Sequence, residues 1–313
     1  MRLWLLALAA CAGPLSSGEP TYPTTSGAIA LANLDHEIAR RGDEPGVEDL
    51  LLERARFLAD VDALDRAVEL AEARSADRRE LLRRARARAA VHRFVDALAD
   101  LEAAERAGAD ADEIAPLRAA IAIATRHAAG QVAGLEALAR RRPGFASRSA
   151  LAGAYAAVGG LEDADRTYAR ALADLDTTSP FPYAWIEFAR GTMWAERDAA
   201  RAEALLQRAL DYLPDFAAAN LHLAELEAAR GDVGSAIARL ERFAHTGEPE
   251  ALGLLGELHV RSGDRELGCL EIAQAHDRYA SLLTRHPQAF AAHAAGLYLG
   301  PARLCAVRPV GGP

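Results

Sequence analysis

Pairs of histidine and glutamate are the residues of this chain whose types and spacing could do chemistry. His222 precedes Glu225 by three positions and Glu257 precedes His259 by two, so each pair falls within one expected helix. A metal ion needs three or four ligands that converge, and the other histidines are scattered. The motifs G-x-G-x-x-G, H-E-x-x-H and G-x-S-x-G do not occur. The sequence therefore predicts no metal ion, no cofactor and no catalytic residue.

The composition excludes further classes of function. Of 313 residues, 51% are hydrophobic and 26% charged, a normal globular balance, and alanine and leucine favour helices. All 36 basic residues are arginine, so a phosphate-loop lysine and a Schiff-base lysine are both excluded. A net charge of −9 argues against general nucleic-acid binding, which needs a basic excess.

The N-terminus reads as an export signal. Met1 and Arg2 precede an eight-residue apolar run, Leu3 to Ala10, which is far shorter than the ~20 residues that span a bilayer. Its length fits the apolar region of a signal peptide. The last four residues, Leu8-Ala9-Ala10-Cys11, resemble a bacterial lipobox. This resemblance implies a signal peptide over residues 1–10 and lipidation of Cys11, in an outer-membrane lipoprotein that faces the periplasm.

An ordinary signal peptide is the alternative for this segment. Ala7-Leu8-Ala9 also fits an A-x-A cleavage site, which would release the protein into the periplasm. The residues that follow, "AGPLSSGEPTYPTTSG", are rich in Gly, Pro, Ser and Thr and have no helical period. Such a composition does not bury enough apolar surface to order itself. We therefore expect a flexible tether over residues 11–25.

A repeated pattern begins near Ser26. The clearest unit, "LAGAYAAVGGLEDADRTYARAL" (residues 151–172), resembles the tetratricopeptide repeat, a helix-turn-helix of about 34 residues. The positions that carry the resemblance are Leu151, Ala152, Tyr155, Gly159, Ala164, Tyr168, Ala171 and Leu172. Small alanines let paired helices approach closely, and Gly159 suits the positive φ of a turn.

The same small position recurs through the chain. It falls at Ala67, Ala97, Gln131, Ala164, Ala202 and Ala236, at intervals of 30, 34, 33, 38 and 34 residues. The resemblance implies an all-α, right-handed superhelical solenoid over residues 26–300, with a leading helix at 26–42. Residues 301–313 do not read as a helix, and we expect an irregular tail there.

The repeat phase assigns residues to the inner, concave face, where this family binds partners. Arg56, Arg79 and Arg86 fall on inner positions of the early repeats, and Glu187 and Glu225 fall on inner positions of later ones. The groove would be basic toward its N-terminal end and acidic toward its C-terminal end. The alternative is that an arginine-rich sequence simply scatters arginine over solvated faces. Arg84 falls outside the groove by the same phase.

The function implied is a non-catalytic scaffold that is lipid-anchored in the cell envelope and binds a protein or peptide partner, such as an acidic segment. The alternative is an auxiliary envelope hydrolase or ligand-binding lipoprotein with a site inside the superhelix. Cys269 and Cys305 lie 36 residues apart, about one repeat. Stacked helices lie about 8–10 Å apart, and α-carbons more than ~7 Å apart cannot be bridged. We therefore expect two separate thiols.

Overall fold

The structure, a computed structural model, describes residues 20–74, 77–243, 246 and 248–305. Its helices are α1 Gly27–Arg41, α2 Val47–Leu58, α3 Val61–Ala73, α4 Arg78–Ala90, α5 Phe94–Arg106, α6 Ala111–Ala124, α7 Val132–Arg141, α8 Phe145–Ala157, α9 Leu161–Ala173, α10 Phe181–Trp194, α11 Ala199–Tyr212, α12 Ala217–Ala229, α13 Val233–Glu241, α14 Pro249–Ser262, α15 Arg265–Arg285 and α16 Pro287–Leu299. Two 3-10 turns are η1, Ala128–Gln131, and η3, Pro301–Cys305. No helix among these residues has both the length and the apolarity to cross a membrane.

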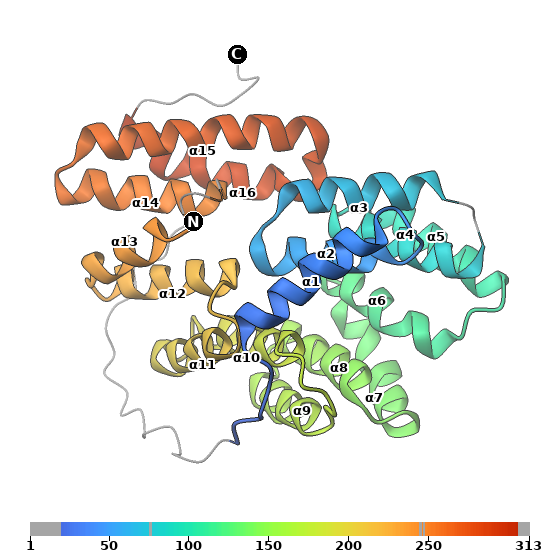
Figure 1. Ribbon diagram of the computed structural model, residues 1–313. Coiled ribbons are helices and arrows are strands. Elements are labelled where there is room, and N and C mark those ends of the chain that lie inside the picture. Colours follow the sequence, from blue (N-terminus) through green and yellow to red (C-terminus); the bar gives the residue numbers. More distant parts are fainter. Residues whose placement is uncertain (1–19, 75–76, 244–245, 247, 306–313) are drawn as a thin grey trace.

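Consecutive helices pack as helix-turn-helix pairs. The closest pairs are α2 with α3, α4 with α5, α8 with α9, α10 with α11, α12 with α13, and α14 with α15. Successive pairs stack into a curved array, in which α1 leads and α16 follows the last pair (Figure 1). The predicted all-α, right-handed superhelical solenoid is confirmed.

Local signals in the sequence start and stop these helices. An aspartate caps the N-terminus of six helices and accepts a backbone N–H there: Asp60, Asp77, Asp110, Asp198, Asp232 and Asp264. Such caps satisfy donors that the helix itself leaves free. Gly159 and Gly231 turn the chain between paired helices at φ of +85° and +91°, a region open mainly to glycine.

Small residues at the helix crossings carry the repeat, with one exception. The alanines at the predicted small position, Ala67, Ala97, Ala164, Ala202 and Ala236, are fully buried. The prediction of Gln131 for this role is wrong, because Gln131 ends the turn η1 before α7 begins. In α7, Leu135 is buried in the hydrophobic core instead, at 2% exposure.

The array curls until its first helices meet both the middle and the last repeats. Phe57 at the end of α2 packs against Phe181 and Phe216, with ring centroids 5.1 and 4.8 Å apart. Asp65 on α3 accepts hydrogen bonds from Arg285 and His286 where α15 passes into α16. Figure 1 shows α3 beside the α15–α16 end of the array. The superhelix is therefore closed rather than open-ended.

The N-terminal segment lies against the middle repeats. Ala30, Leu31 and Leu34 of α1 are buried in the same hydrophobic cluster as Phe57. Tyr22 stacks on Tyr183, with ring centroids 5.3 Å apart, and its N–H donates to the Tyr212 hydroxyl at 3.1 Å.

These contacts correct part of the predicted tether. Residues 20–25 lie against α10 and α11, where the Tyr22 ring and its N–H make these contacts. Residues 11–19, with Cys11 and the whole predicted signal peptide, lie outside the described residues.

The C-terminal region corrects the prediction for the two cysteines. Cys269 and Cys305 form a disulfide, with α-carbons 5.5 Å apart. The expected separation assumed stacked helices, but Cys305 lies on η3, which folds back onto α14 and α15. Arg265 supports this turn by donating to the Leu304 carbonyl at 2.6 Å. Residues 301–305 are thus a stapled turn and not an irregular tail.

Candidate interaction surface

Arg56 lies on α2 with its guanidinium over the indole ring of Trp185 on α10, 5.1 Å from the ring centroid. The side chain is exposed, yet desolvation lowers its pKa below the usual value, against the opposing effect of the Glu53 charge. Protein therefore flanks Arg56 on several sides while solvent still reaches it. The inner-face position that the repeat phase assigns to Arg56 stays a prediction.

Arg79 and Arg86 lie on α4, and both are exposed. Nη1 of Arg86 lies 3.3 Å from a carboxylate oxygen of Asp49 on α2. The Arg79 guanidinium forms no ion pair with the residues that the structure describes. Two guanidiniums thus lie at the surface of α4 with at most one long ion pair, where a partner can reach them.

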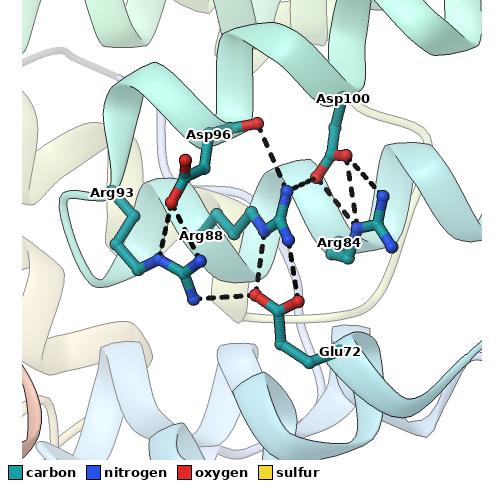
Figure 2. A network of polar contacts seen from close by, with 6 residues as sticks. All are labelled: Glu72, Arg84, Arg88, Arg93, Asp96 and Asp100. Carbon is teal, nitrogen blue, oxygen red and sulfur yellow. Dashed lines mark hydrogen bonds and ion pairs between the residues drawn. The ribbon is translucent and has the colours of Figure 1, made fainter.

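Other arginines of the same stretch are structural. Figure 2 shows the network of Glu72, Arg84, Arg88, Arg93, Asp96 and Asp100, which joins α3, α4 and α5. Arg84 donates from Nη2 to Asp100 at 2.6 Å, and Arg88 joins Asp100 to Glu72 at 2.8 and 2.7 Å. Hydrogen bonds from Arg88 hold the pKa of the Glu72 carboxyl below its usual range, despite partial burial. The stretch therefore divides into packing arginines and exposed ones, and Arg84 belongs to the first group.

Glu187 does not lie where the repeat phase placed it. Its side chain is fully buried between α10 and α11, where Oε2 accepts from Arg190 at 3.1 Å and Oε1 from Arg208 at 2.6 Å. Arg190, itself 1% exposed, also donates to Asp165 on α9 at 2.8 Å. A carboxylate held between two guanidiniums inside the array offers nothing to a partner in the groove.

Glu225 is exposed on α12 and borders two cavities. Its carboxylate lies 2.8 Å from Nδ1 of His222, one turn earlier. Desolvation lowers the His222 pKa, but the bond to Glu225 raises it more, so the net shift is upward. One cavity, of about 550 Å³, has Met193, Leu206 and Leu226 among its apolar walls. The other, of about 160 Å³, lies between α12, α14, α15 and α16.

The residues of the two histidine–glutamate pairs all form ion pairs. No group of three or more His, Cys, Asp or Glu residues in the described ranges is arranged to hold a metal ion. His259 turns away from Glu257 and pairs with Glu271 on α15 at 2.7 Å, while Glu257 pairs with Arg261 at 2.6 Å. The spacing of these residues thus supports ion pairs, some within one helix and one between α14 and α15.

Comparison with known proteins supports the fold. A family profile described as tetratricopeptide repeat matches residues 193–258, which is 66 of the 313 residues. A search of curated proteins finds no match. Among solved structures, the chain is similar to one from a crystal structure titled APC/C hetero-tetramer Cut9–Hcn1. The TM-score is 0.57 and the identity 18%, over 90% of this chain and 54% of that chain, so this chain spans about half its length.

Two smaller repeat proteins are also similar. One is a tetratricopeptide repeat protein from Parabacteroides merdae, with a TM-score of 0.46 and 14% identity over 80% of this chain and 93% of that one. The other is YrrB, titled a TPR protein with an unusual peptide-binding site, with a TM-score of 0.35 and 16% identity over 63% and 97%. At these identities, structural likeness describes the helical-repeat fold alone.

Several side chains at this surface were not found from the sequence. Trp185 and Tyr279 look like ordinary core aromatics, and Glu250 and His293 lie 43 positions apart. The signal that could have found Trp185 is its place on the first helix of a repeat, two residues before Glu187. Contacts between α14 and α16 follow from the delayed end of α15, which the repeat phase does not give.

Proposed function

We propose that the protein is a non-catalytic scaffold of the cell envelope, anchored by a lipid on Cys11, that binds a protein or peptide partner on its inner face. The observation that carries the partner-binding part is the set of exposed arginines Arg56, Arg79 and Arg86 on α2 and α4. Helical-repeat solenoids offer extended concave surfaces of this kind to their partners.

The partner surface expected here carries carboxylates. A guanidinium binds a carboxylate through two parallel hydrogen bonds, and nearby apolar walls strengthen each bond. Trp185 forms such a wall beside Arg56. An acidic segment or a free C-terminus is the partner chemistry that fits this end of the superhelix.

The envelope location has independent support in the disulfide. Disulfides form and persist in oxidising compartments and are rare where glutathione keeps thiols reduced. Cys269 and Cys305 are bonded, which suits an exported protein and agrees with the signal-like run before Cys11. The lipid anchor itself is proposed from the Leu8-Ala9-Ala10-Cys11 sequence alone.

Anchoring is tested at Cys11. The N-terminal peptide of the mature protein should begin at Cys11 and carry acyl chains by mass spectrometry. Cys11→Ser should leave the protein unprocessed or release it from the membrane fraction. A mature N-terminus beginning after Ala9, without lipid, would instead support the secreted alternative.

Partner binding is tested by capture from detergent-solubilised envelope with the mature protein as bait. A variant with Arg79→Glu and Arg86→Glu should lose the specifically captured protein. The matched control carries Arg106→Glu and Arg303→Glu, two exposed arginines away from α2 and α4. Equal loss in both variants would show that only the overall charge matters, and the inner-face proposal would fail.

A further inference from the structure

The smaller cavity beside Glu225 has the size of one side chain. Its volume is about 160 Å³, and Leu254 and Leu297 form apolar walls. An engineered protein cavity of about 150 Å³ holds a benzene molecule, so this one accepts a group of similar bulk. The cavity lies between α12, α14, α15 and α16.

A tyrosine hydroxyl that forms no hydrogen bond with the described residues lines this cavity. Tyr279 on α15 is 2% exposed and is part of the cavity wall. Its Oη makes no hydrogen bond with any residue that the structure describes. Burial raises the Tyr279 pKa, and the charges of Glu250 and Glu248 raise it further, so the hydroxyl stays protonated. The hydroxyl is therefore free to bond a polar group that enters the cavity.

The remaining polar groups of the cavity are mainly acceptors. Three carboxylates line it, those of Glu225, Glu250 and Glu257. Each is paired with a base that is itself exposed: Glu225 with His222, Glu250 with His293, and Glu257 with Arg261, the three bases being 43%, 48% and 60% exposed. Exposed bases turn into solvent at little cost, because surface ion pairs contribute little. The carboxylates are therefore available to an incoming cation.

We propose that this cavity binds an arginine side chain of the partner. A guanidinium offers five donors in a plane and no acceptor, which matches three carboxylates and the lone pair of the Tyr279 hydroxyl. The apolar walls take the methylene stem of the same side chain. This inference rests on the proposed partner binding and adds a second contact, of opposite charge to the one at Arg56, Arg79 and Arg86.

Binding would be linked to a proton. His293 donates to Glu250, which raises the His293 pKa, and this imidazolium competes with an arginine for the same carboxylate. Affinity should therefore rise as pH increases through the His293 pKa. The charged and titratable groups that face the site are Glu225 and His222 on α12, Glu248, Glu250, Glu257 and Arg261 at α14, Tyr279 on α15, and His293 and Tyr298 on α16.

The probe is the capped tripeptide acetyl-Gly-Arg-Gly-amide, compared with the same peptide containing citrulline, which has the shape of arginine without its charge. The full mature chain is titrated with each while NMR follows the imidazole resonances of His293. The arginine peptide should shift these resonances saturably and lower the His293 pKa, and the citrulline peptide should do neither. Equal responses to both peptides would overturn the proposal.

Three variants localise the effect. Tyr279→Phe should lower the affinity for the arginine peptide at least fivefold. The thermal stability of the protein should stay unchanged or rise, because the lost hydroxyl had no partner among the described residues. Gly296→Leu should abolish binding by filling the cavity, since a Cβ at Gly296 meets nothing within 4 Å. Gly134→Leu is the control, at another helical glycine with open space around it. Unchanged peptide affinity in folded Gly296→Leu contradicts the site, even if Tyr279→Phe fails to fold.

The outcome separates this inference from the proposed function. If the arginine peptide does not bind but the captured partner still depends on Arg79 and Arg86, the cavity inference fails and the scaffold stands. If the peptide binds and no partner is captured, the cavity inference stands and the proposed partner binding fails.

Discussion

Asp65 on α3 and His286 at the start of α16 lie 2.6 Å apart, although 221 residues separate them in the chain. Asp65 also accepts from Arg285, so one carboxylate joins the first repeats to the last. The cavity beside this seam measures about 550 Å³ and is lined by Leu58, Val61 and Leu282 among others. The ends of the superhelix therefore meet through this polar contact and through Val61, which packs against the C-terminal hydrophobic cluster.

Removing the Asp65 carboxylate should loosen this seam. Asp65→Ala leaves Arg285 and His286 without their acceptor, but the contact is partly exposed, so the loss of stability should stay near 1 kcal/mol. Spin labels at the exposed positions Glu69 and Thr284 should show a broader distance distribution in the variant. Asp62→Ala, on the same helix, is the control, and identical distributions in all three proteins would show that the seam holds without Asp65.

Reducing the disulfide should destabilise the C-terminal end. The bond closes a loop of 36 residues, for which chain entropy predicts roughly 2–4 kcal/mol. Cys305→Ser should lower the free energy of unfolding in urea by this amount, and wild-type protein in reductant should behave the same way. Thiol counting on unreduced, denatured protein checks the bond itself: two reactive thiols from Cys269 and Cys305 would contradict it.

The buried ion cluster of α9, α10 and α11 should be intolerant of change. Arg190→Met removes a buried guanidinium and leaves the carboxylates of Asp165 and Glu187 poorly compensated, at an expected loss of about 3–5 kcal/mol. Arg166→Met, which breaks an exposed pair with Asp163, should change stability by less than about 0.5 kcal/mol. Urea unfolding measures both, and similar losses would mean that burial does not set the difference.

The same cluster should make the protein sensitive to acid. Burial raises the Asp165 pKa, but the hydrogen bond and charge of Arg190 lower it more, so the folded pKa lies below the unfolded value near 3.9. The stabilisation is therefore present above about pH 4 and is lost as pH falls through the folded pKa. The free energy of unfolding should drop between about pH 4.5 and 2.5, and the drop should be smaller in Asp165→Asn.

Charge reversal at Arg86 should weaken partner binding mainly by lowering the association rate. Arg86 is 42% exposed and already faces Asp49, so its contact with a partner lies at a wet rim. Mutations of rim charges change the association rate and the salt dependence more than the lifetime of the complex. We expect a loss of about three- to tenfold at low salt that vanishes near 0.5 M salt. Arg106→Glu should show a much smaller effect in the same surface-binding measurement.

The repeat phase predicts much of this fold because each helix-turn-helix pair is determined by residues that lie close together in the chain. Ala164, Gly159 and the aspartate caps act within a few residues of their helices, so their roles are legible in the sequence. Gln131 misled because an inserted 3-10 turn delayed α7. The disulfide was missed because nothing local indicates that η3 folds back.

The interaction surface was less predictable for the same physical reason. The repeat phase predicts Arg56 and Glu225 on the inner face, and both side chains are exposed. Glu187 shares that phase but lies beside Arg190 and Arg208, whose guanidiniums draw its carboxylate into the array. Tyr279 gained its place in a cavity wall from the unusual length of α15, a tertiary effect that periodicity does not contain.

The packing of Phe57 onto Phe181 and Phe216 has a consequence for how the chain reaches this state. An open solenoid gains stability one neighbour at a time, so its N-terminal repeats can fold while the rest is still being synthesised. Here the inner surface of α2 stays uncovered until residues about 160 positions later have been made. Such distant contacts slow folding, because a long loop must close first. The early repeats therefore keep this apolar surface exposed until the later repeats have been synthesised.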